Sequence, residues 1–428
     1  MKAFKQLFLP AVFLILIIQV ACKSGTPAGT PTGYNAGLTL PEGFSAVVFA
    51  DNLGSGRHII ARDNGDIYLA LRTLNNGKGI VALRDTDNDG KADSTVYFWK
   101  TLTTGIDISG EYLYFSNFTE VYRVLLFPGE LLPVEEPVLI AGGFPLQNQH
   151  QDKTFALDGS GNLYVNVGAP SNACTVPDRT PGTPGLDPCP QLERHAGIWR
   201  FRADVPGQDQ VADGYHYASG IRNSIAIAWN FENNKLYVVQ HGRDQLSQLF
   251  PDLYSEQEGA ELPAEEFFMV EDGDFFGWPY CYYDQIRKIK LLAPEYGGDK
   301  NAVGRCADAK GPIMAFPGHL APNDLLFYAG SMFPEKYKNG AFIAFHGSWN
   351  RAPLPQEGYY VVFVPFLNGL PEGDMEIFAN GFAGVEVIES PGDAHYRPMG
   401  LAEGPDGSLY VSDSEKGRIW KITYTGAQ

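Results

Sequence analysis

The side chains best suited to chemistry are a histidine and an arginine that stand next to predicted strands. His150 lies in the polar stretch 148–154, and a near-neutral imidazole can remove a proton from a hydroxyl group. Arg222 and Asn223 follow a glycine and precede the apolar segment 225–229, where they offer a fixed cation and an amide to a polar ligand. We predict that His150 and Arg222 are catalytic, although a lone loop histidine more often has no such role.

Other basic and polar side chains recur near the ends of predicted strands. One arginine in such a place usually forms a surface salt bridge, but several at matching positions predict a bound anion. The candidates for binding this anion are Arg72, Lys153, Asn223, His241, Asn350, Arg351 and Arg397. Their distribution predicts a polar site at the centre of the fold.

An acidic segment predicts a separate calcium site. Carboxylates alternate at Asp85, Asp87 and Asp89, a glycine follows, and Lys91 and Asp93 complete the segment. Oxygen ligands at alternate positions with a glycine in the turn are typical of calcium-binding loops. The distant glutamate of a full EF-hand is missing, so we predict a shorter loop with a structural ion. The alternative is a solvated acidic turn.

These candidates must be positioned by a fold that is rich in β-structure. A polar turn followed by an alternating apolar strand occurs six times, within residues 61–71, 109–114, 158–165, 232–239, 337–344 and 405–411. Such turns before aromatic and β-branched residues are hairpin signals. Six irregularly spaced copies predict an all-β, six-bladed propeller with long loops on the ligand-binding face. The alternative is a β-sandwich with a β-rich insertion.

Four cysteines beyond Cys22 predict disulfide bonds. Their spacing favours Cys174–Cys189 and Cys281–Cys306, although four cysteines allow three connectivities. Zinc ligation is the competing interpretation, but neither pair has the spacing of a zinc-binding motif. Since stable disulfides form in oxidising compartments, the pattern agrees with export.

The N-terminal segment also predicts export. Lys2 and Lys5 precede an apolar stretch over residues 7–20, which is typical of a signal peptide. The small residues before Cys22 resemble a lipoprotein cleavage site. We predict a periplasmic or cell-surface protein whose membrane contact is a lipid on Cys22; simple secretion without a lipid is the alternative.

The chain accordingly divides into three predicted parts. Residues 1–22 form the signal peptide with its cleavage site, and residues 23–36, rich in Gly, Thr, Ser and Pro, form a flexible tether. Residues 37–428 form the propeller domain. This last part is long enough to bury a large core.

Charge limits the partners of the chain. The sequence holds 50 Asp and Glu against 32 Lys and Arg, a formal net charge of −18. Nucleic-acid binding requires a concentrated basic face, so we predict no nucleic-acid partner. A small ligand fits this composition better.

The ordered set of motifs resembles the pyrroloquinoline quinone-dependent sugar dehydrogenases. These motifs are the Gly-x-Arg-Asn loop at 220–223, the histidine at position 150, His-Gly at 241–242, Phe-Gly-Trp-Pro at 276–279, and the phrases at 346–351 and 397–413. The last two are most similar to the sorbosone and pyranose branch. The similarity covers roughly residues 40–424 and implies a six-bladed propeller with the quinone across its central mouth.

That resemblance implies a role for each candidate. His150 would be the general base that takes the proton from the anomeric hydroxyl of the sugar, and Arg222 would polarise the quinone. Gly242 and Arg243 would offer carbonyl oxygens to a calcium ion that bridges to the quinone. The implied cofactors are therefore pyrroloquinoline quinone and Ca²⁺. The cofactor's carboxylates would be held by Arg72, Arg351 and Arg397, with Asn223 and His241 beside it.

The predicted function is oxidation of a sugar by hydride transfer to calcium-bound pyrroloquinoline quinone. Departures from the glucose-oxidising branch at Ile221, His241 and His395 leave the sugar open. The sequence has no CxxCH haem motif, so electrons would pass to a separate acceptor, a quinone or a cytochrome. The alternatives are a calcium-dependent lactonase-type hydrolase and a non-enzymatic propeller that binds glycans or proteins.

Overall fold

The computed structural model describes Met1 and residues 35–426. The predicted signal peptide, the lipidation site Cys22 and most of the predicted tether lie outside the described residues. Within the described part of the chain, no helix is long and apolar enough to cross a membrane. Export and lipidation therefore stay predictions.

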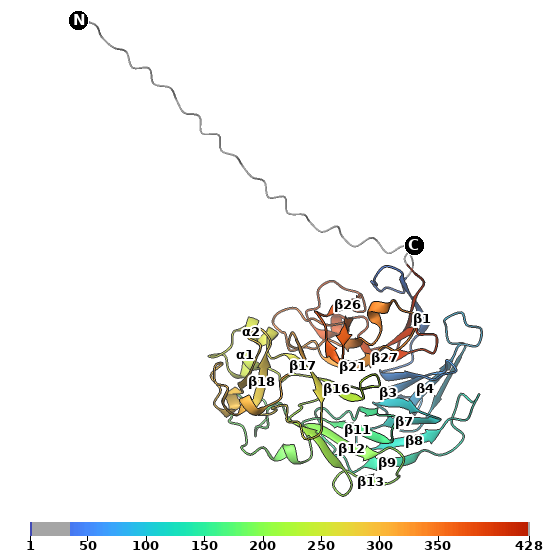
Figure 1. Ribbon diagram of the computed structural model, residues 1–428, viewed down its shortest axis with the longest axis horizontal. Coiled ribbons are helices and arrows are strands. Elements are labelled where there is room, and N and C mark those ends of the chain that lie inside the picture. The colour runs from blue at the N-terminus through green and yellow to red at the C-terminus, as the bar shows by residue number, and fades with distance from the viewer. Residues whose placement is uncertain (2–34, 427–428) are drawn as a thin grey trace.

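Six antiparallel sheets of four main strands surround a central axis (Figure 1). The first blade contains β2 (Gly56–Ala61), β3 (Ile67–Asn75), β4 (Lys78–Arg84) and β5 (Ser94–Phe98). The second contains β6 (Ile106–Ser109), β7 (Tyr112–Ser116), β8 (Val121–Leu125) and β9 (Val138–Gly142), with the short β13 (Gln208–Asp209) added in parallel. The third contains β10 (Phe155–Leu157), β11 (Asn162–Val167), β12 (Gly197–Arg202) and β14 (Tyr215–Ser219).

The other three blades follow in chain order. The fourth contains β15 (Ala226–Asn230), β16 (Lys235–Gln240), β17 (Glu265–Val270) and β20 (Met314–Phe316). The fifth contains β21 (Pro322–Phe327), β22 (Ala341–Phe345), β23 (Tyr360–Val364) and β26 (Glu376–Ala379). The sixth contains β27 (Pro398–Glu403), β28 (Leu409–Asp413), β29 (Ile419–Tyr424) and β1 (Phe44–Ala50). The predicted six-bladed propeller is confirmed.

The sixth blade closes the ring with both ends of the described chain. β1 is its outermost strand and pairs antiparallel with β29, so that Phe44 lies opposite Tyr424 and Val48 opposite Trp420. The backbone hydrogen bonds of this pair join the first strand to the last. The propeller therefore has no open seam between its first and last blades.

Alternation along each strand explains why the blades pack radially. In β3, Ile67 and Leu69 pack in one apolar cluster with Tyr410 of the sixth blade. The intervening Tyr68 packs in another cluster with Leu113 of the second blade. Because successive side chains of a strand point to opposite faces, an apolar residue at every position buries both faces of the blade.

Short helices and hairpins extend the loops between the blades. The helices are α1 (Leu246–Leu249), α2 (Glu256–Glu261), η1 (Pro190–Glu193), η2 (Pro294–Tyr296), η3 (Gly304–Asp308), η4 (Glu335–Tyr337) and η5 (Pro391–Asp393). The extra strands are β18 (Cys281–Asp284), β19 (Ile289–Leu292), β24 (Phe366–Leu367) and β25 (Leu370–Pro371). Both predicted disulfides, Cys174–Cys189 and Cys281–Cys306, are confirmed, and each closes one of these loops.

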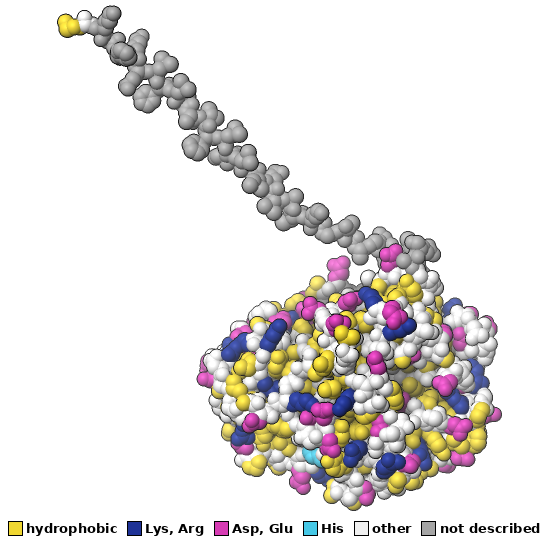
Figure 2. All heavy atoms as spheres, in the orientation of Figure 1, with side chains coloured by type: hydrophobic (Ala, Val, Ile, Leu, Met, Phe, Trp, Pro, Cys, Tyr) yellow, Lys and Arg dark blue, Asp and Glu magenta, His cyan; other side chains and the backbone are white. Residues whose placement is uncertain are grey.

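The surface in view mixes charges of both signs. Figure 2 shows lysine and arginine side chains interspersed with aspartate and glutamate over the whole of this face. No single-sign patch dominates the described residues on this face.

Candidate functional site

A cavity of about 350 Å³ lies on the axis where the inner strands of the blades begin. We call it the arginine cavity, because Arg57, Arg72, Arg179, Arg222 and Arg397 line it. Seven residues predicted for the site reach its wall: His150, Arg222, Arg72, His241, Gly242, Asn350 and Arg397. The structure thus brings together side chains from five blades that are far apart in the sequence.

His150 is fixed with one ring nitrogen bound and the other available. Its Nδ1 lies 2.6 Å from the carbonyl oxygen of Ala169, which can only accept a hydrogen bond. Nδ1 therefore carries the proton, and Nε2 keeps its lone pair. Burial, with a further contribution from the charge of Arg222, lowers the pKa of His150 well below its usual range. The imidazole is neutral at pH 7 and can accept a proton at Nε2.

The loop that carries His150 is held closely against the next blade strand. Gln147 Nε2 donates to the carbonyl oxygens of Gln149, His150 and Gly168. A side chain at Gly168 would place a Cβ atom only 2.5 Å from Cβ of His150 and 2.7 Å from Oδ1 of Asn223. Glycine at position 168 is therefore required for the backbone approach that positions the imidazole.

Arg222 is buried and held by a network centred on Asp244. Its Nη2 lies 2.6 Å from Oδ2 of Asp244, and its Nη1 donates to the carbonyl oxygen of Gly242. Asp244 also accepts from Arg179 at 2.7 Å and from Asn350 Nδ2 at 2.5 Å. Burial alone would raise the pKa of Asp244, but the charges of Arg222 and Arg179 outweigh it and lower the pKa. Asp244 is a carboxylate that orients two guanidinium groups.

Arg179 reaches the cavity from a disulfide-closed loop. It lies between Cys174 and Cys189, which bridge this excursion of the third blade. Besides its bond to Asp244, its guanidinium donates to the side chains of Gln149 and Gln245. The disulfide restricts the conformations of this loop, which helps to hold Arg179 at the cavity.

Several polar atoms on the cavity wall have no partner among the described residues. They include Oδ1 of Asn323 and Oδ1 of Asn350, both buried, whereas Nε of Arg57 forms no hydrogen bond but lies 3.6 Å from Oδ2 of Asp152. The Arg72 guanidinium likewise forms no hydrogen bond or ion pair with the described part of the chain. Buried polar groups are normally satisfied, so these atoms indicate a polar ligand rich in hydrogen-bonding groups. The five arginines that line the cavity favour an anionic ligand.

A second set of oxygen atoms gathers around Gly242. Glu265 Oε2 accepts from the amide of Gly242 at 2.7 Å, and Asp244 lies two residues further along the chain. Burial raises the pKa of Glu265 to about 7. Carboxylate and carbonyl oxygens are the donors that Ca²⁺ prefers, and a bound cation would favour the ionised form of Glu265. The Glu265 carboxylate and the Gly242 carbonyl, which also accepts from Arg222, are oxygen donors of the kind that a hard cation uses.

A family model described as TrAA12-like matches residues 38–425. The chain belongs to the TrAA12-like family. An uncharacterized protein of Borreliella burgdorferi is 24% identical over 429 residues, covering 96% of this chain and 95% of its own length. A pyrroloquinoline quinone-dependent sugar dehydrogenase of Hypocrea jecorina is 24% identical over 440 residues, with the same coverages. The predicted family is thereby confirmed.

Other relatives share the propeller. A pyrroloquinoline quinone-dependent pyranose dehydrogenase of Coprinopsis cinerea is 26% identical over 426 residues, which are 90% of this chain and 54% of that enzyme. The holo form of its quinone-binding domain has a TM-score of 0.71 at 20% identity, covering 90% of this chain and 97% of that one. A calcium structure of the Trichoderma reesei family AA12 enzyme has a TM-score of 0.72 at 19% identity, covering 94% and 100%. These structural likenesses show the fold.

Four residues predicted for the TrAA12-like site do not reach the cavity wall with their side chains. Lys153 is fully buried and donates to the carbonyl oxygen of Gln151. Asn223 is buried behind Arg222. Arg243 forms a buried ion pair with Glu295, and Arg351 pairs with Glu261 and Glu357. Their side chains support the loops that carry the site instead of lining it.

The sequence reasoning missed several residues that the TrAA12-like fold brings to the cavity. They are Arg57, Arg179, Asp244, Glu265, His346 and Asn323. Arg57 lies at the start of the inner strand β2, and Arg222 and Arg397 lie just before the inner strands β15 and β27. The position of Arg57 before the first repeat could therefore have identified it as a site residue. Nothing in the local sequence marks Arg179, because its hydrogen-bond partners Gln149, Asp244 and Gln245 lie 30, 65 and 66 positions away.

The predicted calcium loop lies away from this cavity. It joins β4 to β5. Because β3 and β4 are antiparallel, the end of β4 lies beside the start of β3, whereas Arg72 lies in the later half of β3, at the opposite end of the blade. Carboxylate oxygens of Asp85, Asp87 and Asp89 lie within 4.8 Å of one another. Asp93 instead accepts from the amide and hydroxyl of Thr86. The loop and the cavity are separate features of the TrAA12-like chain.

Proposed function

We propose that this protein is a dehydrogenase that oxidises a sugar with pyrroloquinoline quinone. The observation that carries the proposal is the arginine cavity, with five arginines and polar atoms of Asn323 and Asn350 that have no hydrogen-bond partner among the described residues. A ligand with several carboxylate and carbonyl oxygens would satisfy such donors. The names of the fungal relatives, a sugar and a pyranose dehydrogenase, support the same assignment.

Two residues would have different roles in the reaction: one would accept a proton, and the other would stabilise negative charge. Nε2 of His150, neutral and unprotonated, would accept the proton of a sugar hydroxyl as the adjoining C–H bond breaks. Arg222, held in place by Asp244, would keep positive charge beside the oxygen atoms that become more negative. When bound, the quinone supplies the acceptor for the hydride. Arg72, Arg57 and Arg397 would hold the cofactor's carboxylates.

Calcium is part of the same proposal. Near the cofactor, the Gly242 and Arg243 carbonyl oxygens with the Glu265 carboxylate would bind one Ca²⁺, which orients and polarises the cofactor. A second, structural Ca²⁺ would lie in the loop of Asp85, Asp87 and Asp89, with Lys91 and Asp93 in the same loop. Removing calcium should then affect both cofactor binding and local stability.

The remaining predictions concern the surroundings of the enzyme. We infer an exported protein, in the periplasm or at the cell surface, with Cys22 as its lipid anchor and no other membrane contact. Electrons would leave to a separate quinone or cytochrome, because no CxxCH haem motif is in the sequence. The disulfides Cys174–Cys189 and Cys281–Cys306 support this placement, since disulfides persist in oxidising compartments.

The test separates cofactor binding from turnover. Calcium-loaded protein is titrated with pyrroloquinoline quinone, and dye reduction is then measured over a panel of aldoses and sugar aldehydes. His150→Asn should keep the cofactor affinity and lower turnover about 10²–10⁴-fold, because it removes the general base. Asparagine suits this position because the φ of His150 is +49°, in the left-handed region that asparagine tolerates.

His216→Asn is the matched control. His216 is exposed on β14 and does not line the cavity, so the same substitution there should leave turnover unchanged. A wild-type protein that fails to bind pyrroloquinoline quinone in the presence of calcium would overturn the proposed function. Equal turnover in His150→Asn and the wild type would overturn the role of His150.

A further inference from the structure

A second cavity, of about 230 Å³, lies where the inner strands end. All six inner strands contribute to its wall, β2, β6, β10, β15, β21 and β27. We call it the carboxylate cavity, because its ionisable residues are Asp107, Asp324, Glu232, His58 and Tyr328. No lysine or arginine is among its lining residues in the described chain. It shares no lining residue with the arginine cavity.

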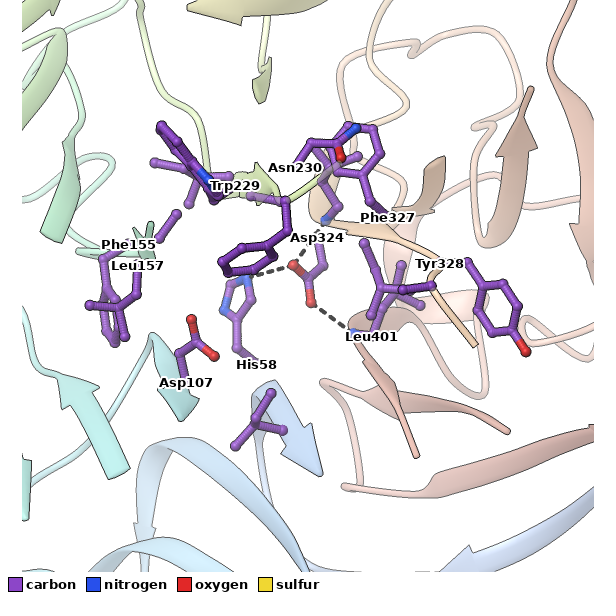
Figure 3. A pocket seen from close by; sticks show the side chains of 18 of the residues that line it. His58, Asp107, Phe155, Leu157, Trp229, Asn230, Asp324, Phe327, Tyr328 and Leu401 are labelled. Atoms are coloured by element: carbon purple, nitrogen blue, oxygen red, sulfur yellow. Dashed lines mark hydrogen bonds and ion pairs between the residues drawn. The ribbon is translucent and has the colours of Figure 1, made fainter. Parts of the chain in front are cut away.

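His58 lies between two carboxylates in this cavity (Figure 3). The side chain of His58 is 8% exposed, and its Nδ1 lies 3.0 Å from the carbonyl oxygen of Thr104. Because that oxygen only accepts, Nδ1 carries a proton, and Nε2 is the nitrogen directed at the carboxylate. Nε2 has no hydrogen-bond partner and faces Oδ1 of Asp324 at 3.5 Å, an ion pair whenever the ring is protonated. No ionisable side chain of the described cavity wall has Asp107 as its partner.

The carboxylates themselves are short of donors. Asp107 accepts one backbone amide, that of Ile108, through Oδ1, and its Oδ2 has no partner among the described residues. Asp324 is 6% exposed and accepts the amides of Leu325 and Leu401. Asp324 has His58 as its one potential cation, and the half-buried Asp107 has none among the described residues that line the cavity. A carboxylate that is withdrawn from water and lacks a cation is costly, so Asp107 favours a positively charged ligand.

Aromatic rings form the rest of the wall. Figure 3 shows Phe155, Trp229 and Phe327 arranged around the carboxylates. Trp229 stacks on Tyr164 at 5.4 Å, which holds its ring in place, and its Nε1 has no hydrogen-bond partner. The faces of aromatic rings attract cations, and primary ammonium groups also donate hydrogen bonds to carboxylates. The cavity is below the 300–1,000 Å³ of drug-sized pockets, so its ligand is small.

We propose that the carboxylate cavity binds a small organic cation, a primary amine with an apolar body. The ammonium group would lie between Asp107 and Asp324, where it donates hydrogen bonds to Asp107 and adds positive charge beside the His58–Asp324 pair. The apolar body would contact Trp229 and Phe327. This site is independent of sugar oxidation, because it lies at the opposite end of the axis from His150 and Arg222.

Isothermal titration calorimetry with benzylamine, benzyl alcohol and benzoate tests the proposal on the cofactor-free protein at pH 8. The three probes share size and ring and differ in charge. Benzylamine should bind at least about tenfold more tightly than benzyl alcohol, and benzoate should not bind. Asp107→Asn keeps the shape of the side chain and should weaken benzylamine binding at least about tenfold.

Asp63→Asn is the matched control. Asp63 is exposed in the β2–β3 turn at the same end of the propeller and does not line the cavity, so this variant removes the same charge without touching the site. Its benzylamine affinity should equal that of the wild type. Equal binding of benzylamine and benzyl alcohol would show an uncharged apolar pocket and overturn the proposal. So would the absence of benzylamine binding, or unchanged affinity in Asp107→Asn.

Discussion

The two ends of the propeller axis differ in charge although the same strands build both. Arg57 and His58 are neighbours in β2, and Asn323 and Asp324 are neighbours in β21. In each pair the first residue lines the arginine cavity and the second lines the carboxylate cavity. The position of a residue along its inner strand therefore decides which of the two cavities it lines, and the blade to which the strand belongs matters less.

The largest effect is expected from Arg222→Met. This change leaves Asp244 buried with one arginine, Arg179, instead of two. Breaking a buried ion pair on one side destabilises a protein by about 3–5 kcal/mol. Urea unfolding of the variant and the wild type should show a loss of this size, and an unchanged midpoint would contradict the role of Asp244 as the centre of the network.

Arg72→Gln should separate binding from stability. Its side chain has no partner among the described residues, so the free energy of unfolding should change by less than about 0.5 kcal/mol. If Arg72 holds a carboxylate of pyrroloquinoline quinone, the affinity for that cofactor should fall roughly tenfold to a hundredfold. Titration of both proteins in calcium measures this; equal affinities would remove Arg72 from the binding set.

Asp107→Asn should stabilise the protein at pH 8 by about 1–3 kcal/mol. Burial, with the charge of Asp324, raises the pKa of Asp107 to about 7. The folded state thus holds this proton more tightly than the unfolded state, and the wild type loses stability as pH rises from about 4 through 7. The advantage of the variant should shrink toward pH 5. Thermal unfolding at both pH values checks it, and a variant less stable at pH 8 would contradict it.

A smaller effect is expected on amine binding. Benzylamine stays protonated between pH 6 and 8, whereas Asp107 changes charge with a pKa of about 7. Affinity for the carboxylate cavity should therefore fall about tenfold from pH 8 to pH 6. The other ionisable residues facing the site are Asp324, Glu232, His58 and Tyr328. Calorimetry at the two pH values measures the change; stronger binding at pH 6 would exclude Asp107 as the partner of the amine.

The fold was largely predictable because its signals are local. Each of the six repeats in the sequence coincides with the turn between the inner strand and the second strand of one blade, from 61–71 in the first to 405–411 in the sixth. Both disulfide pairs followed from spacing, since each closes a loop of 15 or 25 positions. Patterns of this kind involve residues close together in the chain, so they can be recognised without knowing the tertiary contacts.

The site was predictable in part. His150, Arg222 and Arg397 stand beside inner strands, and this position distinguishes them in the sequence. Arg179 and Asp244 meet only because a disulfide-closed loop of one blade folds over the next, 65 positions along the chain. The buried ion pair of Arg243 with Glu295 also escaped prediction, since an arginine that lines a cavity and one that supports a loop look alike in sequence.

The shared sixth blade has a consequence for the order in which the chain can fold. β1 is made before the other strands of the propeller, but its partner β29 follows all of them. During synthesis the hydrogen-bonding edge of β1 therefore stays unpaired until the other five blades have been made. The five other blades can form while the ring is still open. Completion of the ring, and with it of both axial cavities, falls to the final strand.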